Sequence, residues 1–115
     1  SKSLAPFAPD ALESYRAQMR DPARCNALCA DYRAGATYDR TADERDRAAG
    51  HTLKCPLHFL YADGGFPAAT GDPAALWRGW APQVTTSHCK SGHFVMEETP
   101  DAVLSAFAPF FALET

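Results

Sequence analysis

The chain has 115 residues, of which 46% are hydrophobic and 22% charged, and its formal net charge at pH 7 is −3. This composition supplies enough apolar residues for one small folded domain and excludes an intrinsically disordered chain. Basic and acidic residues alternate without a block of one sign, so neither nucleic acid nor an anionic membrane surface is an expected partner.

The same composition bears on location. No apolar segment approaches the roughly 20 residues that a membrane span needs, and residues 1–6 lack the apolar segment and cleavage site of a signal peptide. Of the four cysteines, Cys25 and Cys29 lie one helical turn apart, where a disulfide is rarely possible. We therefore expect these two, together with Cys55 and Cys89, to be reduced, mostly buried thiols in a cytoplasmic protein.

The first half of the chain predicts helices. Apolar residues at helical spacing indicate a helix over residues 9–20. Asp21 is the expected N-cap of the next helix, with Pro22 at its first position and Gly35 as its C-terminal cap. Residues 41–49 form a third expected helix, which has almost no apolar face and is predicted to be a solvated connector.

The second half predicts strands and helices in alternation. Residues 57–61 are a near-continuous apolar run, typical of a buried parallel strand, and residues 84–89 predict a second strand. A helix over about residues 72–80 is expected between them, and Thr99-Pro100 begins the final helix. The fold class is therefore α/β, with an incomplete parallel sheet, because two strands leave unpaired edges and do not form an independent sheet.

A histidine follows the second strand, in the segment Ser91-Gly92-His93-Phe94. Histidine is the side chain best suited to move protons at neutral pH. Glu97-Glu98-Thr99-Pro100 comes next, before the final helix. This order of strand, Gly-His-Phe loop, acidic pair and closing helix is typical of the way an α/β-hydrolase presents its catalytic base. The chain contains neither a Gly-x-Ser-x-Gly nor a Gly-x-Asp-x-Gly nucleophile motif.

Further motifs narrow the resemblance to one group. Over about residues 7–112 the chain resembles the haloacetate (fluoroacetate) dehalogenases, through Asp21-Pro22, Asp31-Tyr32-Arg33-Ala34-Gly35, Cys55-Pro56, Trp77 and the Gly-His-Phe segment. The resemblance implies that residues 1–50 are the second half of a helical cap. It also implies that residues 51–115 are the carboxyl-terminal part of an α/β-hydrolase core.

The resemblance implies a mechanism as well. In that family an aspartate attacks the carbon that bears the halogen and forms an ester, which a histidine-activated water then hydrolyses. The match assigns the general base to His93 and contact with the leaving halide to Tyr32, with a small halo-acid as substrate and no cofactor. The nucleophile and the substrate-clamping arginines would lie outside this chain. The expected partner is the missing amino-terminal half, or a second copy joined through the exposed sheet edge.

The acidic residues on either side of the second strand are expected to have structural and not catalytic roles. Asp63, in Ala62-Asp63-Gly64-Gly65, is expected to be a turn residue, because the catalytic acid of the haloacetate dehalogenases follows the preceding strand. Glu97 and Glu98 are expected to be a solvated pair before the final helix.

Alternatives stay open at this point. An epoxide hydrolase or esterase would share the same scaffold, since the nucleophile decides between them, and a non-catalytic remnant that self-associates is a third reading. Cys25, Cys29, Cys89 and His93 offer four ligands for zinc. However, Cys89 lies within a predicted strand and His93 beyond a glycine turn, so no metal site is predicted.

Overall fold

The computed structural model describes residues 3–112 and divides the chain into two compact units. One unit is Phe7–His51, and the other is Thr52–Thr115 together with Ser1–Pro6. The boundary falls close to the one expected between cap and core. Whether the first unit acts as a cap stays a prediction.

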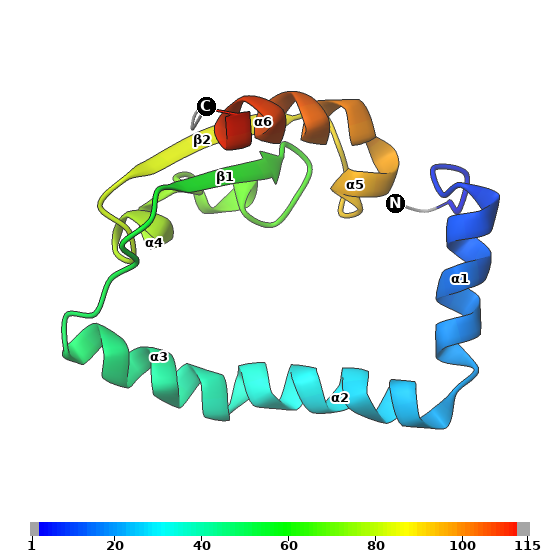
Figure 1. Cartoon of the computed structure of the whole chain (residues 1–115), viewed down its shortest axis with the longest axis horizontal. Coiled ribbons are helices and arrows are strands. Elements are labelled where there is room, and N and C mark those ends of the chain that lie inside the picture. Colours follow the sequence, from blue (N-terminus) through cyan, green and yellow to red (C-terminus); the bar gives the residue numbers. More distant parts are fainter. Residues whose placement is uncertain (1–2, 113–115) are drawn as a thin grey trace. The chain divides into compact units, whose positions relative to one another are not determined.

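The unit Phe7–His51 is helical, with α1 (Pro9–Met19), α2 (Pro22–Ala36) and α3 (Tyr38–Ala48) in succession (Figure 1). The start of α2 is as predicted. The Asp21 side chain accepts a hydrogen bond of 2.9 Å from the Ala23 backbone N–H, and Pro22 occupies the first turn. Asp21 thereby satisfies one of the donors that a helix start leaves unpaired.

The predicted end of α2 is wrong. Gly35 lies inside the helix, and positive φ angles occur among the described glycines at Gly50 and Gly71. The helix instead ends before Thr37, whose hydroxyl donates to the Arg33 carbonyl at 2.7 Å and whose N–H donates to the Ala34 carbonyl at 3.0 Å. These bonds satisfy carbonyls of the last turn, so no glycine cap is needed. As a result α3 begins three residues earlier than expected.

The second unit contains the predicted strands. β1 (Leu57–Ala62) and β2 (Val84–Cys89) pair in parallel, in a register that runs from Leu57↔Val84 to Ala62↔Cys89. The predicted helix between them is reduced to the short α4 (Ala75–Arg78), preceded by a 3-10 turn, η1 (Ala68–Thr70). Glycines and prolines surround this segment and disfavour a longer helix. After β2 come the short α5 (Val95–Glu98) and α6 (Pro100–Ala112).

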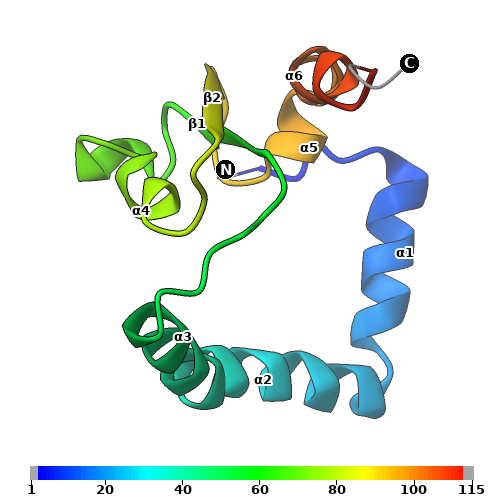
Figure 2. The ribbon, with the colours of Figure 1, turned by 60° about the vertical axis from the view of Figure 1, so that its left-hand side comes forward.

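Helices lie on both sides of the strand pair (Figure 2). Because side chains alternate along a strand, His58 faces α6 and Phe59 faces the side of α4. The His58 ring lies 5.5 Å from the Phe107 ring, and the Phe59 ring lies 5.7 Å from the Trp77 ring. Trp77 of α4 therefore packs against this face of the strand pair.

The interior of this unit is small. Among residues 3–112 the buried hydrophobic residues are Ala62, Ala74 and Ala81, while Phe66 and Phe111 are 84% and 75% exposed. Parallel strands are normally covered on both faces. The sheet is therefore incomplete, as the strand count predicted.

The cysteines are less buried than expected. All four are free, but Cys29 and Cys55 are exposed while Cys25 and Cys89 are half-buried. Cys29 lies on α2, none of whose residues is buried, and Cys55 precedes β1 outside the sheet. No helix within residues 3–112 has both the length and the apolar character to cross a membrane.

Gly35, inside α2, and Gly50, after α3, allow a direct test of where these helices end. We expect Gly35→Ala to raise the free energy of unfolding by about 0.5–1 kcal/mol, since alanine is the better helix residue and an added Cβ meets nothing within 4 Å. Gly50→Ala should lower it by about 1–2 kcal/mol, because φ at Gly50 is +71°. Urea unfolding followed by circular dichroism measures both. A lower free energy of unfolding for Gly35→Ala would instead support the predicted C-cap role of Gly35.

Candidate active site

The candidate site lies where the two parallel strands end. Asp63 follows β1, and the loop that carries His93 follows β2, so both segments meet at the carboxyl edge of the sheet. Ligand sites of open parallel sheets form at this edge. The Asp63 N–H donates to the Cys89 carbonyl at 2.9 Å, and the Gly64 N–H donates to the Ser91 carbonyl at 3.3 Å. The turn after β1 therefore holds the beginning of the histidine loop.

His93 is exposed in this loop, between β2 and α5. Its ring meets the Phe94 ring edge to face, with centroids 5.0 Å apart. An accessible imidazole at this edge is free to reach a substrate or a water molecule, as a general base must. Its catalytic role stays a prediction.

Glu98 grips the backbone on either side of His93. Its Oε2 accepts from the Gly92 N–H at 2.8 Å, and its Oε1 accepts from the Phe94 N–H at 3.2 Å. The expectation that Glu98 is a merely solvated helix-start residue is therefore wrong, because the side chain is half-buried and turned back onto the loop. The short α5 makes this return possible.

These contacts lower the pKa of Glu98 below its ordinary value of 4.5. The hydrogen bond from Gly92 is the main cause, and the bond from Phe94 and the nearby His93 act in the same direction. Partial burial opposes them. Donors aimed at a carboxylate favour its charged form, so Glu98 is an anion at neutral pH.

Gly92 leaves the space that this carboxylate occupies. A Cβ added at Gly92 would lie 2.8 Å from Oε2 and 2.9 Å from Oε1 of Glu98. Any other residue at this position would push the carboxylate away from the loop. The glycine of the Gly-His-Phe segment is thus required by a side chain six positions later.

Asp63 bonds to a histidine that the sequence analysis did not single out. Its Oδ1 lies 2.8 Å from Nδ1 of His88, which is also stacked on the Tyr61 ring at 5.9 Å. Asp63 does stand in the turn after β1, as predicted. Both partners are largely exposed, so this pair contributes little to stability.

Tyr32 lies on α2 in the Phe7–His51 unit, where it is 75% exposed. This exposure leaves its hydroxyl accessible. His93 belongs to the other unit.

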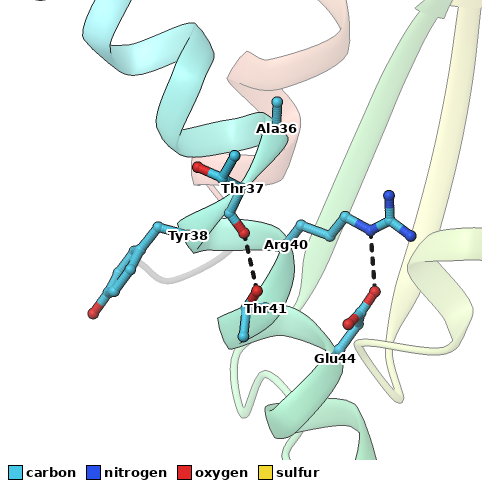
Figure 3. Close-up of a pocket in the computed structure, with 6 residues that line it drawn as sticks. All are labelled: Ala36, Thr37, Tyr38, Arg40, Thr41 and Glu44. Carbon is cyan, nitrogen blue, oxygen red and sulfur yellow. Dashed lines mark hydrogen bonds and ion pairs between the residues drawn. The ribbon is translucent and has the colours of Figure 1, made fainter.

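Two other concave surfaces carry no catalytic set. At the α2–α3 junction, Arg40 pairs with Glu44 and the Thr41 hydroxyl donates to the Thr37 carbonyl, so its polar groups engage one another (Figure 3). A groove beside α6 is lined by Leu57 and other residues at the amino ends of the strands, the edge opposite His93. Within residues 3–112, no three His, Cys, Asp or Glu side chains group as a metal site.

The contacts of Glu98 and His88 were not predicted from the sequence, for different reasons. The contact between His88 and Asp63 follows from the parallel register, in which Ala62 pairs with Cys89. This pairing brings Asp63, the residue after Ala62, close to His88, the residue before Cys89. That signal was available once the strands were paired. The return of Glu98 depends on the one-turn helix α5, which no capping or periodicity signal indicated.

The two hydrogen bonds that Glu98 accepts predict that the conformation of the loop depends on pH. A carboxyl whose pKa is lower in the folded loop stabilises it at pH values above the unfolded pKa, and this stabilisation is lost as the pH falls through the lowered pKa. We therefore expect the Gly92 and Phe94 amide NMR signals to shift on acidification below about pH 5. Glu98→Gln should abolish this titration, while Asp101→Asn, the matched control, should leave it. An unchanged titration in Glu98→Gln would contradict the assignment.

The chain is similar to known proteins over most of its length. No family model matches the chain. The chain is 33% identical over 95 residues to a fluoroacetate dehalogenase of a Burkholderia species, covering 83% of this chain and 31% of the relative. A solved structure from Pseudomonas aeruginosa, assigned as an epoxide hydrolase, is 42% identical with a TM-score of 0.84, covering 93% of this chain and 36% of that one. A mutant of that protein with bound MFA gives the same values.

The chain thus spans about a third of the length of the relatives that it matches. The similarity extends over both its helical and its α/β unit, and the parallel strands, the Gly-His-Phe loop and the closing helix occur in the expected order. The chain has the fold of the carboxyl-terminal part of an α/β-hydrolase.

Proposed function

We propose that the chain forms part of a hydrolase that cleaves the carbon–halogen bond of a small halo-acid through a covalent ester. The similarity to a fluoroacetate dehalogenase supports this reaction class. The observation that carries the proposal is the placement of His93, exposed at the carboxyl edge of the sheet in a loop that is hydrogen-bonded on both sides.

In this mechanism His93 acts in the second step. A carboxylate nucleophile displaces the halide and forms an ester with the substrate carbon, and the halide leaves with the bonding electron pair. His93 then takes a proton from water as its oxygen attacks the ester carbonyl. The ester bond breaks, which releases a hydroxy acid and restores the carboxylate. The nucleophile is not among the residues of this chain.

Tyr32 is proposed to donate a hydrogen bond to the departing halide. A phenolic hydroxyl is a neutral donor, and charge builds up on the halogen as its bond to carbon breaks. Its exposure on α2 leaves the hydroxyl available for this contact.

A test of His93 uses the protein expressed from its complete reading frame. We expect His93→Ala to form the ester and then stall, with hydrolysis slowed about 10²- to 10⁴-fold. Intact-mass spectrometry after addition of fluoroacetate would show the adduct. His51→Ala, which changes an exposed histidine of the helical unit, should turn over normally. Unaltered turnover in His93→Ala would overturn the assignment.

Tyr32 offers a matched pair with Tyr38, which is also 75% exposed. Loss of one hydrogen bond to a developing anion should lower kcat/KM of Tyr32→Phe roughly 10- to 100-fold for fluoroacetate. Tyr38→Phe should remain within about twofold of the wild type. Halide release measured with an ion-selective electrode compares them. Equal effects in the two variants would remove Tyr32 from the site.

The second candidate function is epoxide hydrolysis, which the 42% identity to the Pseudomonas aeruginosa protein favours. The same base and a carboxylate nucleophile would open an epoxide to a diol without releasing halide. Chromatography of products from a styrene-oxide-type substrate, set beside halide release, separates the two functions. If neither the diol nor the halide is formed, the hypothesis of a non-catalytic remnant is the one that remains.

A cytoplasmic location belongs to the same proposal. The four cysteines are free in the structure, and reducing compartments keep thiols in this state.

A further inference from the structure

We propose that Glu98 is a positioning residue for the catalytic base: its carboxylate holds the backbone on both sides of His93 and so fixes the direction of the imidazole. This inference rests on the proposed function of His93. It assigns to Glu98 a task in the reaction that the residue performs without touching the substrate.

One carboxylate holds the loop before and after His93. The two oxygens of one carboxylate accept from Gly92 and Phe94, the residues immediately before and after His93. The Ser91–Gly92 and His93–Phe94 peptide units, one before and one after His93, are therefore tied to the same group. Backbone N–H groups that converge in this way form a concave anion site, and here the anion is supplied by the protein itself.

Glu98 and Phe94 are joined by two hydrogen bonds. The Glu98 backbone N–H donates to the Phe94 carbonyl at 2.8 Å, while its side chain accepts from the Phe94 N–H. This reciprocal pairing resembles a capping box, in which a side chain returns to the residue that starts its own helical turn. The position of α5 therefore constrains the backbone conformation of the loop.

Other hydrogen bonds hold the first part of the loop. Its beginning is held by the turn after β1, through the bonds of Asp63 to Cys89 and of Gly64 to Ser91. Those bonds end at Ser91, two residues before the base. Glu98 continues the support from Gly92 to Phe94.

The charge of Glu98 adds to its geometry. When His93 takes the proton of the attacking water it becomes a cation, and an anion fixed nearby stabilises that state. His93 is one of the groups that lower the pKa of Glu98. The carboxylate is thus suited to the hydrolytic step, in which the imidazolium forms, and not to the formation of the ester.

This separation of steps defines the experiment, which uses single-turnover kinetics of the protein expressed from its complete reading frame with fluoroacetate. Glu98→Gln should form the ester at a rate within about twofold of the wild type and hydrolyse it about 10- to 100-fold more slowly, as expected for a misdirected base. A variant that was merely less stable would have a smaller active fraction. The amplitudes of ester formation and of ester hydrolysis would then fall in the same proportion.

A second variant acts on the same contact from the other side. Gly92→Ala places a Cβ against the carboxylate oxygens, so it should reproduce the slow hydrolysis of Glu98→Gln. The double variant should be no slower than the slower single variant, because both remove one interaction. Asp101→Asn, which removes an exposed carboxyl at the start of α6, should leave both phases unchanged. Additive losses in the double variant would overturn the inference.

The failure of this inference is distinct from that of the proposed function. If His93→Ala stalls at the ester while Glu98→Gln hydrolyses it at the wild-type rate, His93 remains the base and Glu98 has no positioning role. If His93→Ala hydrolyses the ester normally, the proposed function fails, and the inference about Glu98 falls with it.

Discussion

The parallel pairing of β1 with β2 is the constraint on which the rest of the α/β unit depends. The register from Leu57↔Val84 to Ala62↔Cys89 brings together segments that are 27 residues apart in the chain. Since parallel strands end at the same edge, the turn after β1 and the loop after β2 meet there. Two backbone hydrogen bonds then join them. The location of His93 is a consequence of this pairing.

The same pairing fixes the helix that follows the loop. His58 of β1 places its two ring nitrogens 2.8 Å from the Thr85 hydroxyl and 2.9 Å from the Ser87 hydroxyl of β2. The imidazole is thus satisfied on the sheet surface and presents its ring to Phe107 and Phe110 of α6. Net contributions of about 1 kcal/mol are usual for such hydrogen bonds. The histidine loop is therefore anchored by β2 before it and by α6 after it.

The helical unit is organised differently. None of the residues of α1, α2 or α3 is buried, and the described ion pairs within these helices, such as Arg40 with Glu44, are exposed. Exposed pairs contribute at most about 1 kcal/mol each. Local capping, as at Asp21, determines where these helices begin, while packing contributes little within the unit. An exposed Tyr32 is consistent with a surface that meets a substrate, which is the role proposed for it.

The sequence by itself determined the features that depend on local chemistry and periodicity: both strands, the start of α2 at Asp21-Pro22, and the exposed Gly-His-Phe loop. Tertiary structure decided which side chains complete that loop. Glu98 turns back to Gly92, and His88 reaches Asp63 across 25 residues, because strand register and the single turn of α5 bring them together. Neither propensity nor spacing carries that information, since the same residues in another register would remain solvated.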